Sequence, residues 1–221
     1  MFTLAEENYL KAIYHLENDC NSGVSTNAIA VKLETKPSSV TDMVQKLADK
    51  KVLSYQKYKG SMLTKKGKSI AANVIRKHRL WEVFLVEKLN FHWDEVHEIA
   101  EQLEHIKSEE LIKRLDAFLD HPDFDPHGDP IPDENGIIKP TEKKLLSQLQ
   151  KTQRGICVGV KESSSQFLQY LDTRKIGIGT TIKVIDKEEF DDSMTIQIGK
   201  NQLQITDKIS NNLYINTKNY V

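Results

Sequence analysis

The sequence predicts a mainly α-helical protein with small β parts, in three successive regions. Up to about residue 120, apolar residues recur at spacings of three and four, whereas β-branched runs dominate after residue 141. The charge changes too: residues 1–80 hold 14 Lys and Arg against 7 Asp and Glu, and residues 81–140 hold 5 against 16. We therefore expect three domains, at 1–73, 74–140 and 141–221.

The first region has the element order of a winged helix-turn-helix domain. Apolar spacing predicts helices over 4–18, 27–33 and 38–50. Ser25 or Thr26 is a suitable N-cap for the second helix, and Pro37 suits the first turn of the third. Two short β-prone runs then flank a glycine-containing turn at 59–61, which predicts a hairpin. Helix, helix, turn, helix and hairpin together give the winged helix-turn-helix order.

The middle region predicts two long helices and a connector. Helical spacing runs from about residue 70 to 89 and again from about 94 to 119. Residues 121–136 then hold four of the six prolines, which predicts an irregular connector. We expect His121 and His127 in this connector to be exposed to solvent.

The last region predicts a small β barrel with one helix. β-branched runs lie at 180–185, 193–198 and 202–205, with a helix expected at 164–171 and a short polar helix near 142–150. Gly177 and Gly179 are expected to form a turn rather than a phosphate-binding loop.

Composition excludes several classes of protein. No apolar run approaches the roughly 18 residues that could cross a bilayer, and the N-terminal residues lack the basic start and apolar core of a signal peptide. We therefore expect a cytoplasmic protein with no membrane partner. The two cysteines, Cys20 and Cys157, form no CxxC pair, so we expect them to be reduced and partly buried.

The basic first region indicates binding to a polyanion. Short hydroxyl, amide and basic groups on the non-core sides of the third helix suit a DNA major groove, and basic residues on the hairpin suit the phosphate backbone. The alternative is an ordinary solvated helix beside a basic hairpin. The candidate DNA-binding residues are Lys36, Pro37, Ser38, Ser39, Thr41, Gln45, Lys46, Lys57, Lys59 and Lys65.

The acidic middle region indicates metal binding. His97, Glu101, Glu104 and His105 fall at i, i+4, i+7 and i+8, on one stripe of the predicted helix at 94–119. On the preceding helix His78 and Glu82 are four residues apart. Imidazole and carboxylate groups suit Mn²⁺, Fe²⁺, Co²⁺ or Zn²⁺. The alternatives are a charged helix face or a metallohydrolase, although the His-Glu-x-x-His motif is absent.

Several segments together resemble one known family, the metal-dependent repressors of the diphtheria-toxin-repressor and manganese-transport-regulator type, over essentially the whole chain. The segments are the first helix (7–14), the recognition helix (37–47), the wing (58–60 and 63–67), two metal segments (76–82 and 101–105) and the connector (125–132).

The resemblance implies a homodimer that binds double-stranded operator DNA when loaded with Mn²⁺ or Fe²⁺ and represses metal-uptake genes. Co²⁺, Ni²⁺ or Zn²⁺ are possible substitutes in vitro, and neither enzymatic activity nor an organic substrate is expected. The C-terminal region would be the family's SH3-like (FeoA-like) domain. The resemblance gives metal-ligand roles to His78, Glu82, His97, Glu101, Glu104 and His105. The carboxylate at Glu101 favours Mn²⁺, because hard oxygen ligands suit that ion.

Two positions depart from the family pattern. Asn8 stands where the family usually supplies Asp or Met from the first helix, and it can ligate only through a neutral oxygen. Lys11 stands where short manganese regulators supply a carboxylate, so the two-site pattern of the longer members is favoured. In those members the SH3-like domain lends a Glu and a Gln, which Glu162 and Gln166 match with a one-residue difference in spacing. A winged-helix regulator of a small organic effector remains the first rival interpretation.

Overall fold

The computed structural model describes residues 2–18, 23–56 and 60–218, which fold into two compact units. The first unit comprises Met1–Trp81, Ala100–Phe118 and Ile131–Ile138, and the second comprises Glu82–Ile99, Leu119–Pro130 and Lys139–Val221. In the described part of the chain, no helix is long and apolar enough to cross a membrane.

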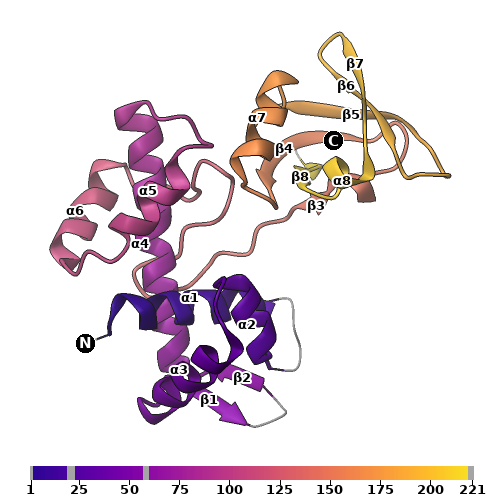
Figure 1. Ribbon diagram of the computed structural model, residues 1–221. Coiled ribbons are helices and arrows are strands. Elements are labelled where there is room, and N and C mark those ends of the chain that lie inside the picture. The colour runs from indigo at the N-terminus through magenta and orange to yellow at the C-terminus, as the bar shows by residue number, and fades with distance from the viewer. Residues whose placement is uncertain (1, 19–22, 57–59, 219–221) are drawn as a thin grey trace. The chain divides into compact units, whose positions relative to one another are not determined.

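The first unit begins with the predicted winged helix-turn-helix order (Figure 1). Ser25 caps the second helix, because its side-chain oxygen accepts the N–H of Ala28 at 3.1 Å. The predicted hairpin pairs Leu53 with Leu63 at its base. The elements are α1 (Leu4–Asn18), α2 (Thr26–Lys32), α3 (Pro37–Asp49), β1 (Leu53–Gln56) and β2 (Gly60–Leu63).

An apolar core holds these elements together. Val40, Val44 and Leu47 lie at the helical spacing predicted for the inner face of α3, and all three are fully buried. Leu10 and Ile13 of α1 belong to the same core cluster. The opposite face of α3 is therefore left for solvent or a partner.

A buried ion pair also joins α1 to α3. Glu6 is fully buried, and the Lys50 ammonium lies 2.6 and 2.8 Å from its two carboxylate oxygens. Lys46 adds a second contact at 3.0 Å, and the N–H of Thr3 donates to Glu6 at 2.9 Å. Burial tends to raise the pKa of Glu6, but the lysines and the Thr3 N–H outweigh it and lower the pKa to about 2. The first turn of α1 is thus fixed to the end of the predicted recognition helix.

The predicted helix at 94–119 is two helices, α5 (Val96–Leu103) and α6 (Glu109–Phe118). Ser108 accounts for the break, because its side-chain oxygen accepts the N–H of Leu111 and starts a new helix. Glu104 and His105 lie in the turn after α5. The single stripe from His97 to His105 that the spacing predicted is therefore wrong. Before these two, α4 (Lys65–Leu89) starts in the first unit and ends in the second.

The second unit contains the predicted small β domain, built on a six-stranded antiparallel sheet of order β3-β8-β4-β5-β6-β7. Of the polar helix predicted near 142–150, only a 3-10 helix at Leu146–Gln148 is present: residues 144–145 pair with β8, and Leu146 and Leu149 are buried in the core. The elements are β3 (Lys144–Leu145), the 3-10 helix η1 (Leu146–Gln148), β4 (Arg154–Val160), α7 (Ser165–Thr173), β5 (Thr181–Lys187), β6 (Met194–Ile198), β7 (Asn201–Ile205), α8 (Asp207–Ser210) and β8 (Leu213–Asn216).

The predicted glycine turn and one of the two cysteines lie in the described residues. Gly179 has a φ of +86°, in agreement with a turn. Cys157 is a free, fully buried thiol, and burial raises its pKa to about 11. Cys20 lies outside the described residues.

The Glu6 ion pair predicts a pH-dependent stability. A folded-state pKa of about 2, below the ordinary 4.5, favours folding above about pH 4.5, and this contribution is lost as pH falls toward 2. We expect Glu6→Gln to lower the free energy of unfolding by roughly 1–3 kcal/mol at pH 7, and the difference from wild type to shrink below about pH 4.5. Urea unfolding across pH 7 to 3 measures it.

Glu110→Gln is the matched control, because Glu110 pairs with Arg114 on an exposed surface of α6. This substitution should lower the free energy of unfolding by less than about 0.5 kcal/mol. Equal stability of Glu6→Gln and wild type at pH 7 would contradict the role assigned to Glu6.

Candidate metal centres and nucleic-acid interface

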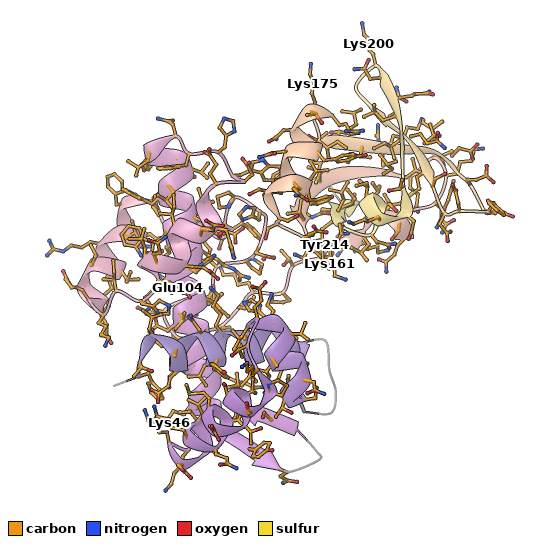
Figure 2. All side chains as sticks on the ribbon, viewed as in Figure 1. Lys46, Glu104, Lys161, Lys175, Lys200 and Tyr214 are labelled. Carbon is orange, nitrogen blue, oxygen red and sulfur yellow. The ribbon has the colours of Figure 1, made fainter. Side chains whose placement is uncertain are left out.

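The exposed face of α3 carries most of the predicted DNA-binding side chains. Ser38, Ser39 and Gln45 are exposed, whereas the Thr41 hydroxyl donates to the Pro37 carbonyl at 3.0 Å. Lys46, labelled in Figure 2, is half exposed while it pairs with buried Glu6. The other exposed candidates are Lys36 and Pro37 at the start of α3 and Lys65 at the start of α4, whereas Lys57 and Lys59 lie outside the described residues.

A first cluster of ionisable groups, the Glu104 cluster, lies inside the first unit, and Figure 2 labels Glu104. The side chain of Glu104 is 1% exposed, and its Oε2 atom lies 2.6 Å from His78 Nδ1 and 2.7 Å from Lys11 Nζ. Glu101 Oε1 lies 3.6 Å from the same Lys11 nitrogen. The cluster consists of Glu7, Lys11, His78, Glu101, Glu104 and His105.

The first helix reaches this cluster at two points. Lys11 contacts Glu104, and one turn earlier Glu7 Oε2 lies 2.7 Å from His105 Nδ1. His105 Nε2 in turn lies 3.7 Å from the other Glu104 oxygen. The predicted first-helix ligand, Asn8, is half buried on the same helix.

The charges around Glu104 determine its protonation. Burial tends to raise the pKa of Glu104, but the hydrogen bond from His78 and the positive charge of Lys11 outweigh it, and the pKa is lowered. Lys77, which is also buried nearby, has its pKa lowered by burial, against the opposing charges of Glu7 and Glu104. The carboxylate is therefore ionised and available as a hard oxygen ligand.

A second cluster, the Glu82 cluster, lies inside the second unit and consists of Glu82, His97, Asp125 and His127. Glu82 is 2% exposed, and its Oε1 lies 3.4 Å from His97 Nδ1 and 3.7 Å from His127 Nδ1. Glu82, Asp125 and His127 are all buried, and each offers a ligand atom within 4.8 Å of the others'.

The connector builds the second cluster by folding back on itself. Asp125 Oδ1 accepts the N–H groups of His127 and Asp129, at 2.8 and 3.0 Å. The ring of His127 donates from Nε2 to the Trp93 carbonyl at 2.8 Å, which directs Nδ1 toward Glu82. Burial tends to lower the pKa of His127, but Glu82, Asp125 and the Trp93 carbonyl outweigh it and raise the pKa to about 9.

Sequence reasoning missed Asp125 and His127 as candidate ligands. The expectation that His127 is exposed is wrong, since it is 4% exposed, although His121 is exposed. An Asp followed two residues later by a Gly-containing turn is a known signature of an aspartate that accepts backbone N–H groups. That signal could have predicted an ordered connector, but not that it would reach Glu82.

The β domain is attached to the second cluster through residues 92–94. The Trp93 ring stacks on His127 and its Nε1 donates to both oxygens of Asp172, at 3.1 and 3.2 Å. Gln169 donates to Asp94 at 2.8 Å. Of the predicted ligands in this domain, Glu162 is half buried and accepts a hydrogen bond from Ser164, and Gln166 is exposed on α7.

Both clusters have the chemistry of a divalent cation site. Each combines carboxylate oxygens with imidazole nitrogens, the ligand set that suits Mn²⁺ and Fe²⁺. Buried carboxylates also need a positive partner, which a metal ion can supply. In the Glu82 cluster, ligand atoms of Glu82, Asp125 and His127 lie within 4.8 Å of one another, whereas in the Glu104 cluster the Lys11 ammonium contacts the candidate ligands.

Gly128 should be needed for the Glu82 cluster. It has a φ of +82°, and a Cβ there would lie 2.0 Å from the Val158 carbonyl oxygen. We expect Gly128→Ala to push the connector off β4, to lower stability and to remove one class of bound Mn²⁺. Mn²⁺ stoichiometry and thermal unfolding measure both effects.

Gly179→Ala is the matched control. Gly179 has a similar φ of +86°, but nothing lies within 4 Å of the added carbon. The substitution should therefore lower the free energy of unfolding only through backbone strain, by roughly 1–3 kcal/mol. Its Mn²⁺ stoichiometry should remain that of the wild type. An unchanged stoichiometry in Gly128→Ala would contradict the role given to the connector.

Comparisons with known proteins show a known order of three domains. Residues 1–61 match the N-terminal DNA binding domain of iron dependent repressors, residues 64–133 match their metal binding and dimerisation domain, and residues 144–217 match the FeoA domain. The chain is 28% identical to a manganese-dependent transcriptional repressor solved in complex with manganese, with a TM-score of 0.87 over 96% of this chain and 99% of that one.

Named relatives cover most of the chain. It is 32% identical to the HTH-type transcriptional regulator MntR of Oceanobacillus iheyensis over 151 residues, which are 68% of this chain and 100% of the relative. It is 26% identical to the diphtheria toxin repressor of Corynebacterium diphtheriae over 220 residues, 95% of each chain. The alignment with the iron-dependent repressor IdeR of Mycobacterium leprae, at 36% identity, spans 54% of that protein. With its winged helix-turn-helix, its two carboxylate–imidazole clusters and its FeoA domain, the chain belongs to the family of metal-dependent transcriptional repressors.

Proposed function

We propose that this protein is a homodimeric repressor that binds operator DNA when Mn²⁺ or Fe²⁺ occupies the Glu104 and Glu82 clusters, and that it controls metal-uptake genes. It acts in the cytoplasm as a binding protein rather than an enzyme. The observation that carries the proposal is that α1 contacts both the Glu104 cluster and the recognition helix.

Two neighbouring residues of α1 make the contacts with the recognition helix and with the Glu104 cluster. Glu6 pairs with Lys46 of α3 and with Lys50 at its C-terminal end, whereas Glu7 contacts His105 of the Glu104 cluster. A cation that binds Glu104 and His105 changes the charges around Glu7 and Lys11. The first helix then passes the change to α3 through the rigid Glu6 ion pair. The metal shifts DNA binding only through its different affinities for the two arrangements.

The ligand chemistry supports Mn²⁺ or Fe²⁺ as the cation. Glu101 and Glu104 offer hard oxygens and His78 and His105 offer imidazole nitrogens, a mixture that also accepts Co²⁺, Ni²⁺ or Zn²⁺ in vitro. In the second unit Glu82, Asp125 and His127 offer a similar mixture. When bound, the cation supplies positive charge that holds these ligands together; the protein residues orient one another and exclude water.

A dimer supports operator recognition. Residues 64–133 match a dimerisation domain, and a twofold dimer presents two copies of α3. Two recognition helices enter successive major grooves when they are about 34 Å apart. In this proposal, metal binding favours the arrangement with that spacing.

Glu104 tests the metal site. Glu104→Gln keeps the size of the side chain but removes its charge, so metal-stimulated DNA binding should be lost or shifted to at least about 100-fold higher Mn²⁺, since even outer-shell partners of a metal contribute 10–100-fold. The measurement is a gel-shift titration on the DNA upstream of the protein's own gene, with Mn²⁺, Fe²⁺, Zn²⁺ and a chelator. A variant that responds to Mn²⁺ at the wild-type concentration would overturn the assignment.

The exposed face of α3 tests DNA recognition. Lys36→Ala should weaken binding to every DNA sequence and reduce the log–log salt slope by about one, because one phosphate contact is lost. Gln45→Ala should instead change the preference among operator variants, because an amide reads base edges. Fluorescence anisotropy at several salt concentrations distinguishes the two. Identical behaviour of both variants would contradict this division of roles.

A further inference from the structure

The Lys11 ammonium lies among three groups that could each bind a metal ion. Its nitrogen lies 2.7 Å from Glu104 Oε2, 3.4 Å from His78 Nδ1 and 3.6 Å from Glu101 Oε1. These groups come from α4, from α5 and from the turn after it, and the Lys11 side chain is only 14% exposed. A positive charge therefore already occupies the centre of the Glu104 cluster.

We propose that Lys11 is a built-in competitor of the metal ion, and that it sets the metal concentration at which the protein responds. This inference rests on the proposed function, because it concerns the same cluster. The incoming cation must displace the ammonium before Glu101, Glu104 and His78 can turn to it. Metal binding is then an exchange of one cation for another.

Burial of Glu104 explains why a resident cation is needed. An ionised carboxylate that is 1% exposed is costly without a positive partner, and a second carboxylate, that of Glu101, lies 3.6 Å from the same ammonium. Lys11 supplies that partner in the metal-free protein. It therefore stabilises the metal-free state more than the loaded state, in which the metal performs the same role. Because Lys11 stabilises the metal-free state more than the metal-loaded state, it weakens the affinity of the cluster for the metal ion.

The chemistry of lysine suits an exchangeable partner. The ammonium is a point charge on a flexible four-carbon chain, so it can move toward water while the chain stays packed. An arginine would hold a carboxylate by two parallel hydrogen bonds and be harder to displace. Lys11→Met should therefore tighten metal binding, and Lys11→Arg should weaken it.

The experiment measures Mn²⁺ binding to the metal-free full chain by the EPR signal of free Mn²⁺. The class of sites that Glu104→Gln removes is the class assigned to this cluster. We expect Lys11→Met to lower the dissociation constant of that class by about tenfold, and Lys11→Arg to raise it, a coupling of ordinary size for two sites in contact. Lys11→Gln is a second neutral variant, should the Met variant fold poorly.

Thermal unfolding gives an independent readout. Lys11→Met should lower the unfolding temperature of the metal-free protein and change that of the Mn²⁺-loaded protein much less, because only the metal-free state depends on the ammonium. The matched control is Lys68→Met, which removes the same charge from an ion pair with Glu17 in the same unit, at 3.1 Å. It should leave the Mn²⁺ affinity unchanged.

The outcomes separate this inference from the proposed function. If Glu104→Gln removes a class of Mn²⁺ sites but neutral variants of Lys11 bind with wild-type or weaker affinity, Lys11 is not a competitor and this inference alone fails. If Glu104→Gln removes no class, the Glu104 cluster is not a metal site and both fail. A shift of equal size in Lys68→Met would mean that net charge, rather than position, is responsible.

Discussion

A buried negative charge at Glu104 is the constraint on which the first unit depends. The carboxylate lies out of contact with water, so cations must be brought to it from other parts of the chain. Lys11 comes from α1 and His78 from α4, and both contact the same oxygen. Electrostatic attraction as well as apolar packing therefore determines the position of α1 against the later helices.

The same helix makes a second buried charge contact in its first turn. Glu6 contacts Lys46 of α3 and Lys50, the residue that follows it, while Glu7 contacts His105. Successive residues on a helix point about 100° apart, so one short segment can face two different partners. A chemical event at the Glu104 cluster therefore has a short, stiff route to the recognition helix. The proposed function uses this route to couple metal binding to DNA binding.

In the second unit, an irregular segment, the connector, brings an imidazole group to the buried carboxylate of Glu82. Asp125 organises the connector by accepting backbone N–H groups, and the absence of a side chain at Gly128 lets the connector lie against β4. His127 is then oriented by the Trp93 carbonyl and directed at Glu82. Since Val160 also donates its N–H to the His127 carbonyl at 2.9 Å, the β domain and the cluster are built as one piece.

The sequence by itself determined the architecture and most of the chemistry. Helical spacing located α1 to α4, with Val40, Val44 and Leu47 inward, and the β-branched runs located β5 to β7, because local periodicity reports which face is buried. It also predicted carboxylates and imidazoles as candidate metal ligands. Only the tertiary structure decided how these groups are divided between two clusters. The helix that carries His97 ends at Leu103, so Glu104 lies in the turn after it, and the connector brings His127 to Glu82. Strand β3 and the role of Lys11 likewise depend on residues distant in the sequence, and periodicity carries no information about such contacts.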